Sequence, residues 1–348
     1  MDAPAPSPVA TSGEHYDLLR VLAAFLVFAG HQQALSGKPE PAFLGFVTWG
    51  ELAVGLFFSL SGYLVSESWR RDPSPGRYLL RRGLRLLPGL CGVVLFSAFV
   101  LGPLMSSLPL GTYLTSSQTY GYLQNLALHV RFELPGLFAA NPVAGAVNGS
   151  LWTLPMEVAS YLVLALALAV LSRLRAAWIV WPLAIGLWCL DRWSPPGETW
   201  VIYATNWRIG VHFATFFFFG AALRLAPPPR FQPIPAAMLA AATLMFLANS
   251  RLAYWSAPLC VTLLVIGAAR VSAVPSRWVG RWGDLSYGLY LYAFPVQQAV
   301  LASGIFAGSP RRLFVTAWLA TVLCAWLSWR YVEAPALRFK PRKRPAAV

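Results

Sequence analysis

The sequence predicts an all-α membrane protein that crosses the bilayer about ten times, with both termini in the cytoplasm. Three observations support this fold class: a composition that is 57% hydrophobic and only 11% charged, long apolar segments along the whole chain, and an uneven distribution of basic residues between them. Soluble domains carry about a quarter charged residues. The composition therefore excludes soluble domains as the main part of this chain of 348 residues.

The predicted spans are apolar segments that recur from one end of the chain to the other. Crossing a hydrocarbon core of about 30 Å takes roughly 17 to 25 helical residues. Ten segments approach or meet this length, at residues 17–35, 45–66, 84–104, 150–171, 175–190, 205–224, 233–248, 254–270, 284–304 and 311–332. The only long connection without a convincing span is 105–149. Small residues in the second span predict a close helix approach, at Gly55, Ser59, Ser61 and Gly62.

The basic residues between the spans predict the orientation of the chain. If the N-terminus is cytoplasmic, 20 Lys and Arg residues lie inside and seven lie outside, at Lys38, Arg131, Arg192, Arg208, Arg251, Arg311 and Arg312. Cytoplasmic loops carry such an excess of positive charge, so both termini are expected inside. This excess accounts for the formal net charge of +14, and nucleic acid is not an expected partner.

One membrane domain, residues 16–339, is expected between two short cytoplasmic ends. Residues 1–15 are rich in Pro, Ala and Ser and lack the basic start and cleavage site of a signal peptide. They predict a disordered lead, and residues 340–348 predict a basic tail. The four cysteines lie far apart in apolar segments without a CxxC pattern, so neither a disulfide framework nor a metal site is expected.

Four ionisable side chains fall within or near the predicted spans: Arg20, His31, Glu51 and Glu157. Such groups are costly in a bilayer and are functional candidates by default. Arg20 and His31 are eleven residues apart, which places both on one face of the first helix about 16 Å apart. Arg20 alone is equally well explained by contact with cytoplasmic headgroups, with Asp17 as its partner. Glu51 is expected to be solvated near the outer interface.

His31 and Glu157 form the predicted catalytic pair. At about 1.5 Å per residue, His31 lies about 21 Å above the cytoplasmic start of its helix and Glu157 about 10 Å below the outer start of its own. The two therefore reach similar depths. A carboxylate beside an imidazole orients it as a general base and stabilises its cation. The alternative is that each is a structural polar residue within the bundle.

The segment RYLLRRGLRLLPG, residues 77–89, predicts a phosphate-binding site at the cytoplasmic side. It places Arg82 and Arg85 three positions apart where a helix enters the membrane. Neighbouring guanidiniums suit phosphate groups because each offers forked donors and a permanent charge. Juxtamembrane arginines more often set orientation or contact lipid headgroups, and that alternative stays open on the pattern alone.

Six motifs, in order, resemble those of the acyltransferase-3 family of bacterial membrane O-acyltransferases, from about residue 16 to 339. YDLLRVLAAFLVFAGH is similar to the family's first-helix signature, with its basic residue at Arg20 and its histidine at His31. RRGLRLLP resembles the R-x-x-R entry that carries Arg82 and Arg85, and SLWTLPMEVASYL resembles a block whose acid is Glu157. The other three matches are GLFFSLSGYLV, LSYGLYLYAFPV and RYVEAPALRF.

The resemblance implies an enzyme that uses acyl-CoA, commonly acetyl-CoA, to acylate sugar hydroxyls on cell-surface or exported glycans, and macrolide-type products in some members. His31 and Glu157 are then expected to be catalytic, and Arg20, Arg82 and Arg85 to bind the acyl-CoA. The acyl group passes either directly to the acceptor, with His31 as general base, or through an acyl-histidine. One departure is visible: Ala293 stands where the family often has a histidine.

We therefore expect an O-acyltransferase of the bacterial inner membrane, with acyl-CoA as donor, a carbohydrate or glycolipid as acceptor, and no metal. A transporter of a small solute with ten helices is the main alternative. A solute carrier needs no site for CoA phosphates, so Arg82 and Arg85 together with a buried His31 favour the enzyme. A polyprenyl-linked glycosyltransferase is disfavoured because no acidic loop suited to a metal-bound nucleotide sugar is present.

Overall fold

The computed structural model describes residues 14–174, 177–194, 199–270, 283–305 and 308–341, which are largely helical. Each of the ten expected spans contains one main helix: α1 (Glu14–Leu35), α2 (Trp49–Arg71), α3 (Pro75–Phe96), α7 (Thr153–Leu174), α8 (Val180–Trp193), α9 (Trp207–Leu225), α10 (Pro233–Phe246), α11 (Arg251–Ala268), α13 (Ser286–Ala302) and α14 (Pro310–Ser328). Seven helical segments of the described ranges are long and apolar enough to cross a membrane, those built on α1, α2, α3, α7, α9, α11 and α14. Helices α8, α10 and α13 are shorter, at 14, 14 and 17 residues.

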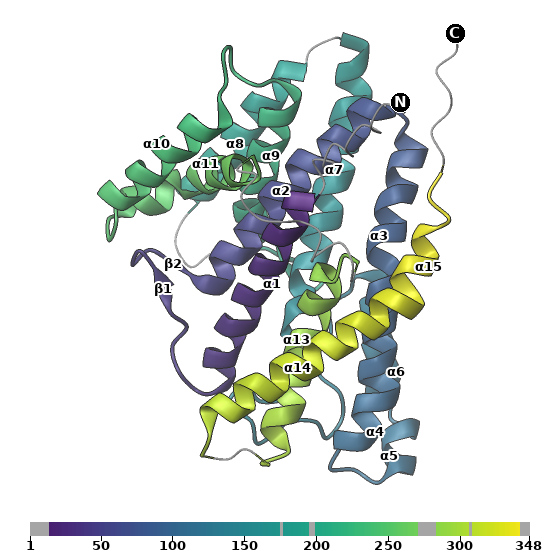
Figure 1. The fold of residues 1–348 in the computed structure, drawn as a ribbon. Helices are drawn as coiled ribbons and strands as arrows, with labels where there is room; N and C mark the ends of the chain where they lie inside the picture. Colours follow the sequence, from purple (N-terminus) through teal and green to yellow (C-terminus); the bar gives the residue numbers. More distant parts are fainter. Residues whose placement is uncertain (1–13, 175–176, 195–198, 271–282, 306–307, 342–348) are drawn as a thin grey trace, which may run out of the picture.

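The helices form one bundle around α1 and α2. In Figure 1, α8, α9, α10 and α11 gather on one side and α3 lies on the other, while α14 crosses the front obliquely. Helix α13 packs against both α1 and α14. Helix α14 continues through a π-helical turn, η5 (Trp329–Glu333), into α15 (Ala334–Leu337), and both of these contact α3. The end of the membrane domain is thereby brought back to the start of α3.

Helices α2 and α9 pack closely through glycines. A side chain on Gly62 would overlap the carbonyl oxygen of Phe217, and one on Gly220 would overlap that of Ser59. The hydroxyl of Ser59 also shares a hydrogen bond of 2.8 Å with Thr262 of α11. Small residues let helix backbones approach closely in a bilayer, where lipid is as apolar as the side chains. The close approach predicted from the small residues of α2 is confirmed.

The connection before α7 contains only short helical turns, as predicted. Helix α3 runs on through a π-helical turn, η1 (Ser97–Leu101), into α4 (Gly102–Met105). The connection then forms α5 (Leu110–Thr115), α6 (Ser117–Gly121) and two 3-10 turns, η2 (Tyr122–Ala127) and η3 (Gly149–Trp152). Its last part is tied to α13, because Gln298 Nε2 donates to the carbonyls of Val143 and Ala146 at 2.8 and 2.7 Å. Asn148 donates to the Leu291 carbonyl at 2.9 Å. These bonds fix the start of α7, which carries Glu157.

Two short antiparallel hairpins precede α2 and α9. They are β1 (Ala42–Phe43) with β2 (Val47–Thr48), and β3 (Val201–Ile202) with β4 (Thr205–Asn206). Each hairpin ends in a helix cap: Thr48 Oγ1 accepts from the Glu51 amide at 3.2 Å, and Asn206 Oδ1 accepts from the Arg208 amide at 3.1 Å. Such caps satisfy backbone donors that a helix start leaves free. The hairpins thus fix the first turns of both helices.

Both ends of the membrane domain lie at the same end of the bundle. Arg20 near the start of α1, Arg82 near the start of α3 and Lys340 after α15 line one cavity. This arrangement is what two cytoplasmic termini require, and the side of the membrane on which it lies stays a prediction. Helix α1 begins at Glu14, two residues before the predicted boundary. Residues 1–13 of the predicted lead and 342–348 of the predicted tail lie outside the described residues.

Candidate active site

A cavity of about 270 Å³ between α1, α2, α3, α7 and α13 brings together most of the predicted site residues. We call it the basic cavity, because Arg20, Arg82, Arg85 and Lys340 all line it. Glu157 lines it as well. Four of the five residues predicted from the sequence therefore share one cavity, and Lys340 was not among those predicted.

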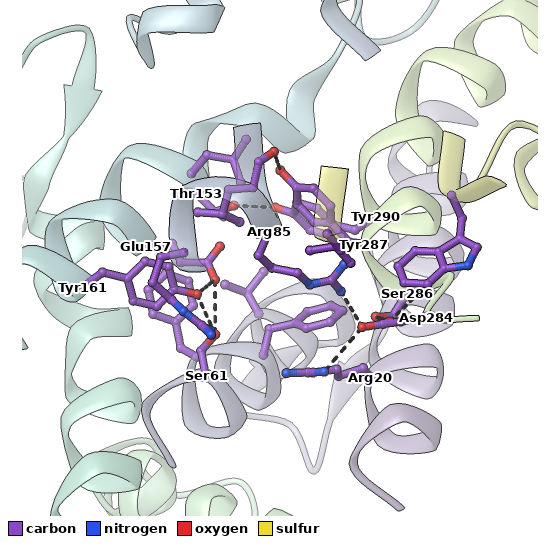
Figure 2. A pocket seen from close by; sticks show the side chains of 18 of the residues that line it. Arg20, Ser61, Arg85, Thr153, Glu157, Tyr161, Asp284, Ser286, Tyr287 and Tyr290 are labelled. Carbon is purple, nitrogen blue, oxygen red and sulfur yellow. Dashed lines mark hydrogen bonds and ion pairs between the residues drawn. The ribbon is translucent and has the colours of Figure 1, made fainter. Parts of the chain in front are cut away.

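Asp284 joins two of the arginines in the basic cavity. Its carboxylate lies 2.5 Å from Arg85 Nη2 and 3.5 Å from Arg20 Nη1. On its other side, Arg85 Nη1 lies 3.4 Å from Glu333 Oε2, whose side chain is only 2% exposed. Figure 2 shows Asp284 lying between the guanidiniums of Arg85 and Arg20. This ion network fixes α1, α3, α13 and the end of α14 relative to one another.

Arg82 differs from Arg20 and Arg85 because no ion pair joins it to a carboxylate among the described residues. Its Nε is buried and has no hydrogen-bond partner in the described ranges, and its guanidinium lies 5.9 Å from the centre of the Tyr161 ring. Burial, together with the positive charges of Arg82 and Arg85, lowers the pKa of Lys340. Positive charges crowd this cavity, and an anionic ligand would relieve their repulsion.

Glu157 contacts hydroxyl groups. Its Oε1 accepts from Ser61 Oγ at 3.1 Å and from the Tyr161 hydroxyl. One turn earlier on α7, Thr153 shares a hydrogen bond of 2.6 Å with Tyr290, whose hydroxyl lies 2.8 Å from the Ser150 carbonyl. Figure 2 shows Glu157, Ser61 and Tyr161 on one side of the cavity and Asp284 with its arginines on the other.

A second cavity, of about 700 Å³, lies at the far end of α1 and contains His31. We call it the histidine cavity, since His212 lines it too. The ring of His31 packs edge-on against Phe294 at 5.1 Å, and its Nδ1 makes no hydrogen bond to any described residue. Val54 and Tyr290 line both cavities. The two cavities therefore adjoin at these two side chains.

The predicted pairing of Glu157 with His31 is wrong. Glu157 binds Ser61 and Tyr161 in the basic cavity, whereas His31 lies in the histidine cavity and has no carboxylate partner among the described residues. Ser61 is twelve residues into α2, about 18 Å from its start, whereas His31 is four residues, about 6 Å, from the end of α1. Both of those helix ends lie at the histidine cavity, so Glu157 lies deeper in the bundle than was estimated.

The histidine cavity contains a carboxylate–histidine assembly that the sequence analysis missed. His212 Nδ1 lies 2.9 Å from Asp191 Oδ2, and His212 Nε2 lies 3.2 Å from Glu51 Oε1. Glu51 therefore contacts a histidine, beyond the solvated role expected for it. His212 lies inside a predicted span, and the rule that marked His31 as a candidate would also have marked His212. No group of three or more His, Cys, Asp or Glu side chains in the described ranges is arranged to hold a metal ion.

Residues 15–330 match the model of the acyltransferase-3 family, described as an acyltransferase domain. The chain belongs to this family. It is 26% identical to an O-acetyl transferase of Shigella phage Sf6, over 95% of this chain and 97% of that protein. It is also 27% identical to nodulation protein 10 of Rhizobium leguminosarum bv. viciae, over 96% of both chains. No solved structure matches it.

Membership of the acyltransferase-3 family makes the protein a multi-pass membrane acyltransferase. Ala293, where the sequence departs from the family's pattern, lines neither cavity. Ala293 is fully buried in an apolar cluster with Phe28 and Ala317, between α1 and α14. This position is therefore part of the packing in this member of the family.

Proposed function

We propose that the protein transfers an acyl group, typically acetyl, from acyl-CoA in the basic cavity to a sugar hydroxyl in the histidine cavity. The acceptor is a cell-surface or exported glycan or a glycolipid, and the enzyme lies in the bacterial inner membrane. The relative named as an O-acetyl transferase supports O-acylation. The proposal assigns donor and acceptor to opposite ends of one bundle.

The observation that carries the proposal is the pair of adjoining cavities with different chemistry. Arginine binds phosphate through forked, charge-assisted hydrogen bonds, and the basic cavity has Arg82 free of any carboxylate partner in the described ranges. The histidine cavity, at 700 Å³, falls within the usual size of about 300–1,000 Å³ for ligand pockets. A donor bound in the basic cavity has to extend its thioester to Val54 and Tyr290, which line both cavities, to meet an acceptor beside His31.

His31 is the proposed general base for transfer. Neutral imidazole accepts a proton from a hydroxyl group near neutral pH. The hydroxyl oxygen attacks the thioester carbonyl, the C–S bond breaks, and the proton taken by His31 passes to the departing CoA sulfur. In the competing relay, an imidazole nitrogen attacks the thioester carbonyl and the C–S bond breaks, so CoA leaves as a thiol that carries the proton lost by the ring. The acceptor hydroxyl then attacks the acyl-imidazole, the C–N bond breaks, and the hydroxyl proton returns to the ring.

Radiolabelled acetyl-CoA tests the proposal directly. The purified protein in nanodiscs, given labelled acetyl-CoA and surface glycan from a deletion strain, should move label to the glycan. Mass spectrometry of glycans from deletion and complemented strains should show the matching acetyl mass. Label trapped on the protein with donor alone would indicate the acyl-histidine relay. Uptake of solute into vesicles without any use of acetyl-CoA would support the transporter instead.

A further inference from the structure

A third hollow, of about 460 Å³, lies beside the basic cavity at the same end of the bundle. We call it the arginine groove. It is lined by cations from α2, α3 and α9, from the turn after α11 and from the segment after α15: Arg71, Arg81, Arg224, Arg270 and Lys340. Lys340 also lines the basic cavity, so the two sites adjoin at this side chain. The donor and acceptor sites proposed above do not include the arginine groove.

The groove has more positive than negative charge. Its lining carboxylates are Glu67 and Asp72, against five lining cations. Glu67 is shared, since Arg71 Nε lies 2.7 Å from Oε1 and Arg224 pairs with Oε2. Asp72 is shared as well: Arg81 Nη1 lies 2.5 Å from Oδ2, and Arg77, outside the groove, pairs with Oδ1. Three lining cations are thus in excess, which favours a ligand with several negative charges.

Arg270 is the cation best placed to meet such a ligand. It lies two residues beyond the end of α11, is exposed, and its Nη2 donates to the Tyr63 hydroxyl at 3.2 Å. None of the ion pairs among the described residues includes Arg270, so its remaining donors are available to a phosphate. Arginine offers five N–H donors in a planar fork that matches phosphate oxygens.

We infer that the arginine groove binds the 3′-phosphorylated nucleotide end of the acyl-CoA donor. This inference rests on the proposed function. The charges of acyl-CoA lie at its nucleotide end, and an uncharged pantetheine arm separates them from the thioester. The basic cavity, at 270 Å³, is below the usual range of about 300–1,000 Å³ for drug-sized ligands. It is too small for the whole donor: the arm, the thioester and the pyrophosphate that Arg82 meets lie in it, and the 3′-phosphorylated nucleoside needs a neighbouring site.

The position of Lys340 explains why a donor is favoured over a lipid headgroup as the occupant. A lipid phosphate would need only the groove, at the membrane surface. A donor needs phosphate contacts that continue from the groove into the cavity where the thioester reacts, and Lys340 belongs to both linings. In this arrangement the pyrophosphate lies near Lys340 and the 3′-phosphate near Arg270.

Two donors that differ by one phosphate test the inference. Acetyl transfer is measured in phosphatidylcholine nanodiscs, with and without phosphatidylglycerol, using acetyl-CoA and acetyl-dephospho-CoA, which lacks only the 3′-phosphate. The wild-type KM should be about tenfold higher for the dephospho donor, the effect of one charge-assisted contact. Arg270→Gln should raise the KM for acetyl-CoA about tenfold and bring it close to that for the dephospho donor. Arg71→Gln, at a side chain that is 57% exposed, provides a second groove variant.

The matched control is Arg230→Gln, an exposed arginine in the connection after α9 that does not line the groove. It should leave the preference between the two donors unchanged. Equal wild-type KM values for the two donors would overturn the inference and leave the proposed function standing. So would an Arg270→Gln variant that keeps its donor preference but loses stimulation by phosphatidylglycerol, since the groove would then be a lipid site. A wild-type protein that does not use acetyl-CoA would overturn the proposed function and this inference together.

Discussion

Replacing Arg82 by glutamine is expected to weaken acyl-CoA binding and leave the fold intact. No carboxylate pairs with Arg82 in the described part of the chain, so the substitution leaves no buried acid without a partner. The lost contact with Tyr161, at 5.9 Å, is worth about 0.5–1 kcal/mol. A hydrogen bond to a charged group contributes about 1.5–3 kcal/mol, which is about 10- to 100-fold in affinity. The KM for acetyl-CoA should rise by that factor.

The same substitution at Arg85 is expected to damage the fold instead. Arg85 lies between Asp284 and Glu333, and the side chains of Arg85 and Asp284 are each 17% exposed. Removing one partner of a buried ion pair costs about 3–5 kcal/mol, because the other charge stays buried. Arg85→Gln should therefore lower the yield of folded protein. The double variant Arg85→Gln/Glu333→Gln should recover part of that yield.

Initial rates in nanodiscs give the KM, and melting followed by size-exclusion chromatography gives the stability of each variant. Arg330→Gln, at an exposed arginine of η5 that lines neither the basic cavity nor the arginine groove, is the control. Arg82→Lys keeps the positive charge but loses the forked donors of the guanidinium. Its KM for acetyl-CoA should lie between those of wild type and Arg82→Gln. An unchanged KM in Arg82→Gln would refute the donor-binding role. An Arg85→Gln variant as stable as wild type would refute the energetic argument for the ion network.

Substitutions at other positions separate catalysis from folding. His31→Ala should keep expression and membrane insertion, but its transfer rate, measured with labelled acetyl-CoA, should fall by about 10²–10⁴. Normal activity in this variant would refute the role of His31 as general base. Glu157→Ala should also lower transfer, because it removes the carboxylate that holds Ser61 and Tyr161 at the wall of the basic cavity; His31→Ala should be at least as severe in the same assay. Gly62→Val should prevent the packing of α2 on α9 and lower the folded yield in fluorescence-detected chromatography, whereas Gly76→Val, with open space around it, should not. Hydrogen bonds from Arg77 and Arg81 lower the pKa of Asp72. The ionised Asp72 carboxylate therefore stabilises the fold above its ordinary pKa of about 3.9, and this stabilisation is lost as the pH falls. Asp72→Asn should reduce the drop in melting temperature between pH 5 and pH 3.

The helices and much of the basic cavity could be predicted from the sequence. Apolar length located the helices because bilayer thickness sets the length of a span. Motif order selected Arg20, Arg82, Arg85 and Glu157, which the structure brings into one cavity. The neighbours of each helix could not be predicted, because depth along a helix does not determine which other helix faces a side chain. The pairing of Glu157 with His31 failed for this reason.

The acids missed from the sequence lie at the boundaries of the predicted spans. Asp191 is one residue beyond the predicted span 175–190, and Glu333 is one residue beyond 311–332. Asp284 is the first residue of the span 284–304. A charged residue at the end of a span is usually solvated, so the rule for intramembrane charges does not select it. Only the folded bundle shows that these acids are held against arginines or a histidine.

The separation of His31 from Glu157 limits how a positive charge on His31 can be stabilised during transfer. Among the described residues lining the histidine cavity, the acids are Glu40, Glu51 and Asp191. Glu51 and Asp191 already lie against His212, and Glu40 Oε1 accepts from the Gly50 amide at 2.5 Å. No carboxylate is therefore positioned to hold an imidazolium at His31 without giving up another contact. In the proposed reaction, the negative charges brought to this place are the oxyanion of the tetrahedral intermediate and then the departing CoA thiolate. Direct transfer in which His31 hands its proton to that sulfur needs no fixed acid beside the ring, and it agrees with an imidazole whose Nδ1 makes no hydrogen bond.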